Sequence, residues 1–169
     1  MEKATASSLQ LVCPTIAAGS TLPAEQVFNG FGCTGPNVSP ALQWSGAPAG
    51  TKSFALTIYD PDAPTGSGWW HWIVYDMPPG VNTLASGAGD ASGKGLPGGA
   101  KHGRSDFGTY AFGGACPPEG HSPHHYIFTL YALDLDTLGV PADASAALIG
   151  YMIGHHTLAK SSFTALYSR

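Results

Sequence analysis

Three segments of this chain alternate apolar with other residues at a period of two, over lengths typical of β-strands. They are residues 53–60 (SFALTIYD), 69–77 (WWHWIVYDM) and 124–134 (HHYIFTLYALD). A period of two sends successive side chains to opposite faces of a sheet, and aromatic and β-branched residues favour that conformation. The turn between the first two segments contains PTGSG, which predicts a hairpin. The chain is therefore expected to fold around an antiparallel sheet.

The same alternation predicts which side chains share a face of each strand. In the first segment one face carries Phe54, Leu56 and Ile58. In the second segment the expected faces are Trp69, His71, Ile73 and Tyr75 on one side and Trp70, Trp72 and Val74 on the other. In the third segment the shared face carries His124, Tyr126, Phe128 and Leu130.

The remaining segments have weaker patterns. Short strands are expected at 9–14 and 39–44, and a last one around Phe163, Ala165 and Tyr167. A helix is expected near the C-terminus behind an N-cap at Asp143. Its residues at helical spacing are Ala147, Leu148, Tyr151, Met152, His155 and Leu158. Residues 83–123 carry many Gly and Pro and little periodicity, which indicates a functional or disordered segment.

Composition agrees with a β-rich fold. Glycine and proline make 23 + 14 = 37 of the 169 residues, which favours turns and long loops over helices. We expect one mainly β domain over 1–169, an antiparallel sandwich with one C-terminal helix, and a flexible tail over 1–8.

Charge and cysteine content exclude several classes of partner. Charged residues make 11% of the chain, its net charge is −4, and its seven basic residues are scattered, so nucleic acid and acidic membrane surfaces are poor partners. No stretch approaches about 20 apolar residues, so we expect no integral membrane association, and the N-terminus has no signal-peptide pattern. Cys13, Cys33 and Cys116 are odd in number and widely spaced, as free thiols of a reducing compartment would be. The expected location is the cytoplasm.

Side chains suited to binding or proton transfer gather at predicted strand ends. Asp60 ends the first strand, Asp62 follows it, and His71 begins the second. His124 and Tyr126 begin the third, behind the stiff loop CPPEGHSP at 116–123. Backbone amides of such a loop and protonated imidazoles both bind anions. A carboxylate such as Asp60 raises the pKa of a neighbouring histidine and helps keep it charged. These ends predict a pocket for a small phosphate or carboxylate group.

Other interpretations of the same residues stay open. His71 and the tryptophans also suit a core, and Asp60 with Asp62 suits a turn. His121, His124 and His125 are a possible metal set, although their spacing matches no common zinc motif. Cys116 with His124 is a possible nucleophile and base. GKGLPG at 93–98 fits a dinucleotide-binding pattern without the required strand and helix, so we interpret it as a loop.

Two long motifs resemble one known family. DPDAPTGSGWWHWIVYDMP and CPPEGHSPHHYIFTLYALD are similar to segments of the phosphatidylethanolamine-binding proteins, also called Raf kinase inhibitor proteins, and most to their bacterial YbhB/YbcL-like branch. The resemblance covers nearly the whole chain. It implies a Greek-key β-sandwich with a small anion pocket, and a cis peptide before a proline of the first motif. The implied ligand-binding residues are Asp60, Asp62, Trp69, His71, Pro117, Pro118, His124 and Tyr126, and we add the neighbouring Cys116 as a ninth.

Two departures from the family bear on the pocket. Cys116 stands where many eukaryotic relatives have glycine, and a thiol there narrows the pocket or is open to oxidation. The eukaryotic C-terminal helix that partly closes the pocket has no counterpart after Tyr167. The resemblance to the bacterial branch also implies a homodimer.

These observations predict a binding protein rather than an enzyme, with no cofactor and no metal. Its ligand is a phosphoryl group, such as a phospholipid head group or a phosphorylated side chain, and its protein partner is a kinase or a protease. One alternative is a phosphate-ester hydrolase that uses His71 and His124 as acid and base. The other is an inhibitor that acts through surface loops independently of the pocket.

Overall fold

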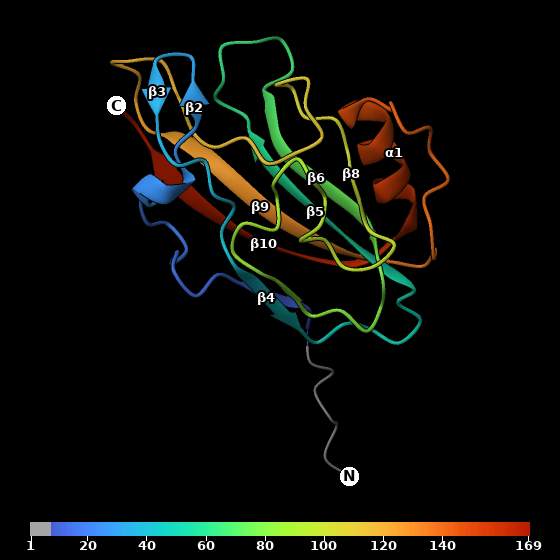
Figure 1. The fold of residues 1–169 in the computed structure, drawn as a ribbon. Helices are drawn as coiled ribbons and strands as arrows, with labels where there is room; N and C mark the ends of the chain where they lie inside the picture. Colours follow the sequence, from blue (N-terminus) through green and yellow to red (C-terminus); the bar gives the residue numbers. More distant parts are fainter. Residues whose placement is uncertain (1–7) are drawn as a thin grey trace.

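The computed structural model describes residues 8–169, so the expected tail over 1–8 lies outside the described residues except for Ser8. Figure 1 shows strands packed in layers with one helix at the side. The elements are β1 (Gln10–Val12), the 3-10 helix η1 (Ala24–Gln26), β2 (Asn29–Gly30), β3 (Cys33–Thr34), β4 (Leu42–Ser45), β5 (Ser53–Asp60), β6 (Trp69–Met77), β7 (Thr83–Leu84), β8 (Lys101–His102), β9 (His124–Leu133), α1 (Ala146–His156) and β10 (Thr157–Tyr167).

The central sheet has five strands in the order β10-β9-β5-β6-β8, and its neighbouring strands all pair antiparallel. The three segments with the strongest alternation become β5, β6 and β9, and β5 with β6 forms the expected hairpin. A smaller sheet has the order β1-β4-β7, and β2 pairs with β3 as a separate hairpin. The prediction of a mainly β, antiparallel fold is confirmed.

The two faces of the central sheet pack against different layers. Phe54, Leu56 and Ile58 lie in one buried cluster with Leu42 and Trp44 of the smaller sheet, which makes this side a sandwich. The opposite face packs against α1 through a second cluster. The members of that cluster include Ala55, Ile73, Tyr75, Ile149 and Ile153. Because both faces are covered, β5 and β6 are buried along almost their whole length.

The predicted faces of β6 are wrong at its first residues, because a bulge breaks the alternation. Ile58 pairs with Trp72 and Tyr59 pairs with Trp70, so His71 is the extra residue between them. Trp70 consequently contacts Tyr59, with ring centroids 4.4 Å apart, and packs with the α1 side together with Ile73. The bulge turns His71 toward the sandwich side of the sheet. Without the bulge, His71 would face α1.

The C-terminal region differs from its prediction in two ways. α1 is capped by Ser145, whose side chain accepts a hydrogen bond from the Leu148 N–H, and not by Asp143. Its buried residues are Ala146, Ile149 and Ile153, whereas the predicted apolar positions Leu148 and Tyr151 are exposed. The last strand, β10, is eleven residues long and pairs with all of β9. Its first half alternates exposed and half-buried residues, so hydrophobicity gave no signal there.

Two further expectations concern the backbone and the membrane. The described residues contain no cis peptide bond, so the implied cis proline is wrong. Within residues 8–169, no helix is long and apolar enough to cross a membrane. Between 83 and 123 the chain has only β7 and β8 as regular elements, and GKGLPG at 93–98 is a loop, as predicted.

Candidate functional site

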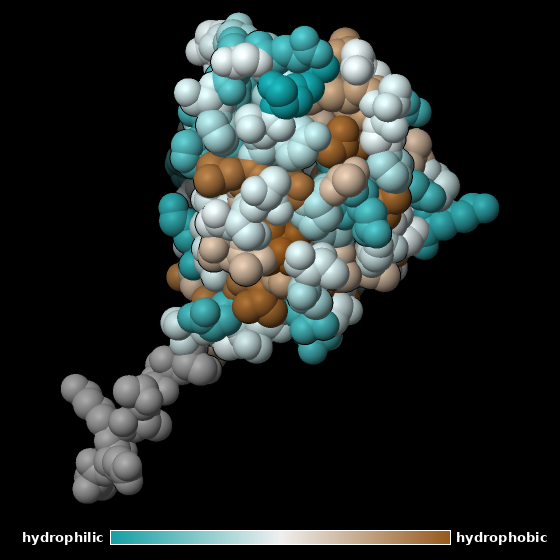
Figure 2. All heavy atoms as spheres, turned by 90° about the vertical axis from the view of Figure 1, so that its left-hand side faces the viewer, coloured by the Kyte–Doolittle hydropathy of each residue, from teal (hydrophilic) through white to brown (hydrophobic). Residues whose placement is uncertain are grey.

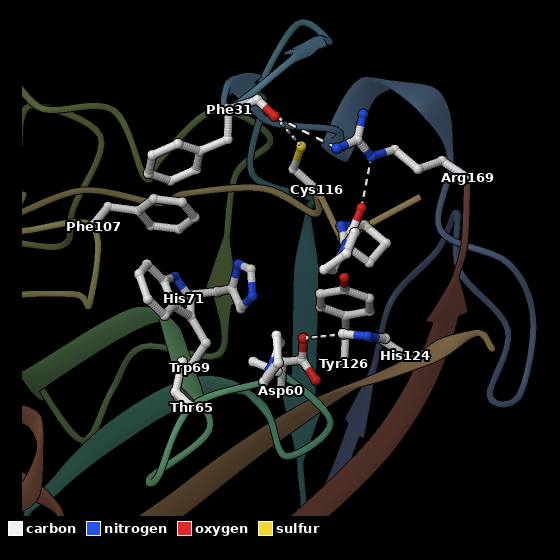
Figure 3. A pocket seen from close by; sticks show the side chains of 14 residues that line it. Phe31, Asp60, Thr65, Trp69, His71, Phe107, Cys116, His124, Tyr126 and Arg169 are labelled. Atoms are coloured by element: carbon white, nitrogen blue, oxygen red, sulfur yellow. Dashed lines mark hydrogen bonds and ion pairs between the residues drawn. The ribbon is translucent and has the colours of Figure 1, made fainter. Parts of the chain in front are cut away.

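A pocket of about 350 Å³ opens where β5 ends and where β6 and β9 begin (Figure 3). Eight of the nine predicted site residues line it, and Asp62 does not. The eight are Asp60, Trp69, His71, Cys116, Pro117, Pro118, His124 and Tyr126. The pocket also has Phe31, Ala63, Pro64, Thr65, Phe107 and Arg169 in its walls. Strand ends far apart in the sequence therefore meet at one site.

The floor of the pocket contains a buried pair of a carboxylate and an imidazole. His124 Nδ1 lies 2.7 Å from Asp60 Oδ2, and both side chains are almost fully buried. A carboxylate accepts, so Nδ1 carries a proton and the tautomer of His124 is fixed. The other ring nitrogen, Nε2, lies 3.2 Å from Nδ1 of the exposed His121. A hydrogen-bonded chain therefore runs from Asp60 to the protein surface.

Asp62 forms a parallel but exposed pair beside the pocket. Its Oδ2 accepts from the backbone N–H of His125 and lies 2.7 Å from the Nδ1 of the same residue. Partial burial raises the pKa of Asp62, but the hydrogen bonds and charge of His125 outweigh it, so the pKa is lowered on balance. Asp62 thus anchors the start of β9 and is not a wall of the pocket.

His71 is held by the loop that precedes Cys116. Its Nδ1 lies 2.8 Å from the Gly113 carbonyl oxygen, which can only accept, so Nδ1 donates. In the neutral ring the second nitrogen, Nε2, is then an acceptor. Burial lowers the pKa of His71, and the charge of Asp60 offsets this only in part. The expectation that Asp60 keeps a histidine charged therefore fails for His71.

Tyr126 lies above the same buried pair. Its ring centroid is 5.1 Å from that of His71, at a steep interplanar angle of 73°. Burial raises the pKa of the Tyr126 phenol, and the carboxylate of Asp60 raises it further. The hydroxyl therefore keeps its proton and is available as a donor.

Trp69 has a buried donor without a partner. Its indole Nε1 is inaccessible to solvent and makes no hydrogen bond within residues 8–169. The indoles of Trp44 and Trp72, by contrast, donate to the Val81 carbonyl oxygen and to His102 Nδ1, at 3.0 and 3.2 Å. A buried donor left unpaired costs about 1–3 kcal/mol. Trp69 lines the pocket, so an acceptor that reaches this N–H when a ligand binds would remove this cost.

A disulfide closes one wall of the pocket. Cys33 of β3 is bonded to Cys116, whose sequence separation is 83 residues. The expectation of free thiols is therefore wrong for these two residues and holds for Cys13. Oxidised Cys116 cannot act as a nucleophile beside His124. Disulfides persist in oxidising compartments, so the predicted cytoplasmic location loses the thiols as its support.

The residues described contain no group of three or more His, Cys, Asp or Glu side chains arranged to hold a metal ion. His121 and His124 contact each other, whereas His125 turns to Asp62. The three histidines considered as metal ligands from the sequence therefore do not converge on one point. The polar groups of the pocket are instead several donors, the carboxylate of Asp60 and the acceptor nitrogen of His71.

Comparison with known proteins places the chain in a family. The profile described as phosphatidylethanolamine-binding protein matches residues 13–168. The chain belongs to this family. It is 51% identical to YbcL of Escherichia coli over 164 residues, which cover 97% of the chain and 90% of YbcL. It is 46% identical to E. coli YbhB over 160 residues, 95% of the chain and all of YbhB. The suspected branch of the family is therefore confirmed.

The solved structures of the family agree with the fold. The crystal structure of E. coli YbcL, described as a member of the mammalian family, superposes with a TM-score of 0.94 at 50% identity. The match covers 96% of this chain and 99% of that one. A further family relative, 38% identical over 140 residues (83% of the chain and 62% of the relative), is named a putative lipoprotein, LppC of Mycobacterium tuberculosis. The name of this relative does not support a cytoplasmic location, which stays a prediction for this chain.

Six lining residues were not among the predicted site residues, and three of them, Phe31, Phe107 and Arg169, lie outside the two long motifs. Phe107 is placed by Asp106, which exchanges hydrogen bonds with Trp70, and its ring packs where a side chain on Gly113 would stand. Phe31 is in the β2–β3 turn. Arg169 donates from Nε to the Pro117 carbonyl oxygen at 2.6 Å. All three are single residues in loops or at the chain end, without a motif, so no periodic signal marks them.

Proposed function

We propose that this pocket binds a phosphoryl group, which makes the chain a phosphoryl-binding member of its family. The observation that carries the proposal is the buried, unpartnered N–H of Trp69 within the described chain. Tyr126 adds a protonated hydroxyl, and Arg169 adds a guanidinium that is always charged. Donors that converge in a mostly apolar pocket suit an oxygen-rich anion.

Arg169 supplies the positive charge that was expected from histidine. Its guanidinium donates to the carbonyl oxygens of Pro117 and Phe31 and to the carboxylate of Glu119, which leaves two of its five N–H donors for a ligand. Its position at the pocket rim favours an anion there even with His71 neutral.

Neutral His71 should make the pocket prefer anions that carry a proton over anions that do not. Its Nδ1 is engaged by Gly113, so Nε2 presents a lone pair in the pocket. A phosphate monoester has a pKa near 6 and carries a proton part of the time at neutral pH. That P–O–H group can donate to Nε2, whereas sulfate has no proton to donate. The proposal therefore expects phosphate to bind more tightly than sulfate.

The test is calorimetric titration with phosphate, O-phosphoethanolamine, sulfate and acetate. Trp69→Phe removes the N–H and keeps a ring, so phosphate affinity should fall about ten-fold or more, as for a hydrogen bond to a charged group. Trp70→Phe, at the neighbouring position on the other face, is the matched control and should bind as the wild type does. Equal affinity in Trp69→Phe and the wild type would refute the proposal.

The buried Asp60–His124 pair gives the hydrolase alternative its one supporting observation, since an oriented imidazole is the usual general base. Nε2 of His124 already contacts His121, however, and Cys116 is in the disulfide. We therefore rank binding above hydrolysis. Turnover of p-nitrophenyl phosphate that disappears in His124→Ala would reverse this order.

The regulatory role that the family resemblance implies follows from the same pocket. A kinase or another partner that presents a phosphorylated side chain would occupy it, and free phosphate would compete. An inhibitor that acts through loops alone would be insensitive to phosphate and to Trp69→Phe.

A further inference from the structure

Phe31, at the rim of the pocket, combines two unfavourable features. Its backbone is in the left-handed region, with φ of 53°, where residues other than glycine are strained. Its side chain is 70% exposed, the highest value among the large hydrophobic residues that are exposed in 8–169. Neither feature stabilises the protein alone. A strained backbone that presents an apolar ring to solvent suggests that the ring has a binding role.

Neighbouring bonds hold Phe31 in place. Arg169 Nη2 donates to its carbonyl oxygen at 3.5 Å, and two residues later Cys33 is fixed by the disulfide. The ring of Phe31 lies 5.5 Å from that of Phe28 and 5.9 Å from that of Phe107, centroid to centroid. The exposed ring is therefore one member of a fixed aromatic cluster. Figure 3 shows the rings of Phe31 and Phe107 near each other on the same side of the pocket.

A second cavity, of about 470 Å³, adjoins this cluster. Phe31 and Phe107 line both cavities, and the second is further lined by Phe28, Phe112, Ala91 and Asp90. Phe28 stacks on Phe107 with centroids 4.2 Å apart. The first cavity collects hydrogen-bond donors, whereas the second is bounded mainly by rings and small residues, with the carboxylate of Asp90 at an exposed position.

We propose that the second cavity receives an aromatic substituent of the ligand, so that the chain binds an aryl phosphate ester across the two cavities. This inference rests on the proposed phosphoryl binding in the first cavity. Aromatic rings pair favourably with one another beyond the area that they bury, and the Asp90 carboxylate disfavours a second anionic group.

The surface around the hairpin supports a small ligand over a second copy of the chain. Figure 2 views the side that carries the β2–β3 hairpin and the C-terminus, and its hydrophobic residues form separate patches among hydrophilic ones. Stable dimers generally bury about 800 Å² per partner with an apolar centre. Ligand binding across Phe31 needs no such continuous area.

The test compares inorganic phosphate, phenyl phosphate and hexyl phosphate by calorimetry. The wild type should bind phenyl phosphate on the order of five-fold more tightly than phosphate, with hexyl phosphate between them. Phe31→Ala should remove the preference. Ala91→Trp places a large side chain in the second cavity alone, so it should remove the preference and keep phosphate binding. Tyr110→Ala removes another exposed aromatic ring, outside both cavities, and should change nothing.

The outcomes separate this inference from the proposed function. Phosphate binding without an aryl preference would overturn the inference alone, as would a preference that survives both Phe31→Ala and Ala91→Trp. Equal affinity for hexyl phosphate and phenyl phosphate would overturn the claim that the second cavity receives an aromatic substituent. Failure of all three ligands to bind would refute both proposals. A dimer in light scattering that Phe31→Ala dissociates would assign the ring to a second copy of the chain instead.

Discussion

Two carboxylate–histidine pairs lie side by side at the start of β9, with the same distance between Nδ1 and Oδ2 but very different burial. Asp60 contacts His124 and Asp62 contacts His125, each at 2.7 Å between Nδ1 and Oδ2. The side chains of Asp60 and His124 are 4% and 3% exposed, and those of Asp62 and His125 are 39% and 54% exposed. Equal geometry therefore occurs in two different dielectric environments. Breaking the buried pair should therefore lower the free energy of unfolding strongly, whereas breaking the exposed pair should change it little.

Replacing the two aspartates should give the largest difference between the pairs. Asp60→Ala leaves buried His124 without its acceptor, and we expect a loss of about 3–5 kcal/mol in the free energy of unfolding. Asp62→Ala should cost about 1 kcal/mol or less, because water and salt screen an exposed pair. Urea denaturation measures both. Equal losses would show that burial is not what distinguishes the pairs.

Removing the disulfide should reduce the difference in stability cost between the buried and the exposed pair. Cys116 lines the same pocket as Asp60 and His124, whereas the Asp62–His125 pair lies outside it. Replacing both Cys33 and Cys116 by Ser should lower the free energy of unfolding by about 2–4 kcal/mol. Water would also enter the pocket, so Asp60→Ala should cost less in that background than in the wild type.

Cys13→Ser is the matched control for the disulfide variant, because Cys13 is free and only half-buried. It should leave stability within about 0.5 kcal/mol of the wild type. If the stability losses of the disulfide variant and of Asp60→Ala simply add in the combined variant, the claim that the disulfide protects the buried pair is contradicted.

His71 adds a third environment, a buried imidazole that bonds a carbonyl oxygen rather than a carboxylate. Its folded pKa lies below the ordinary 6.5, chiefly because of burial. Between the folded pKa and 6.5 the unfolded chain binds more protons, so stability should fall as pH falls through that window. His71→Phe should flatten this part of the stability–pH curve. NMR titration of the ring should show an apparent pKa under 6.5, and a value above it would contradict the assignment.

Asp62 should give the smallest effect. Its pKa is lowered on balance in the folded state, since the bonds from His125 outweigh partial burial. Its stabilising contribution is therefore present above the ordinary value of 3.8 and is lost as pH falls through the folded pKa. Asp62→Asn should weaken the acid dependence of stability slightly below pH 4, by well under 1 kcal/mol at this exposed site. If stability below pH 4 depends on pH in Asp62→Asn as it does in the wild type, Asp62 does not contribute to the acid dependence.

The sequence predicted the parts of the molecule whose periodicity survives folding. Phe54, Leu56 and Ile58 alternate because β5 is regular, and the same holds for Tyr126, Phe128 and Leu130 in β9. Where the backbone is irregular the prediction failed. His71 changes face at the bulge in β6, and no local sequence pattern predicts the extra residue of a bulge. β10 was underestimated because it is an edge strand whose outer residues are polar.

The candidate site divides in the same way. Asp60, Trp69, His71 and His124 were found because each is at the end of a predicted strand. Phe31, Phe107 and Arg169 reach the pocket only through contacts between segments remote in sequence, and the Cys33–Cys116 bond joins residues 83 apart. Such contacts are set by the packed fold, so neither spacing nor composition could have indicated them.

The measurement that tests the central claim most directly is a ¹⁵N–¹H spectrum of the four tryptophan indoles during addition of inorganic phosphate. Trp44 and Trp72 donate within the protein, and Trp70 faces away from the pocket. The Trp69 signal, assigned through Trp69→Phe, should move downfield and saturate as its N–H gains an acceptor, while the other three stay nearly fixed. A Trp69 signal that does not respond at millimolar phosphate, or four signals that drift together without saturating, would contradict phosphoryl binding in this pocket.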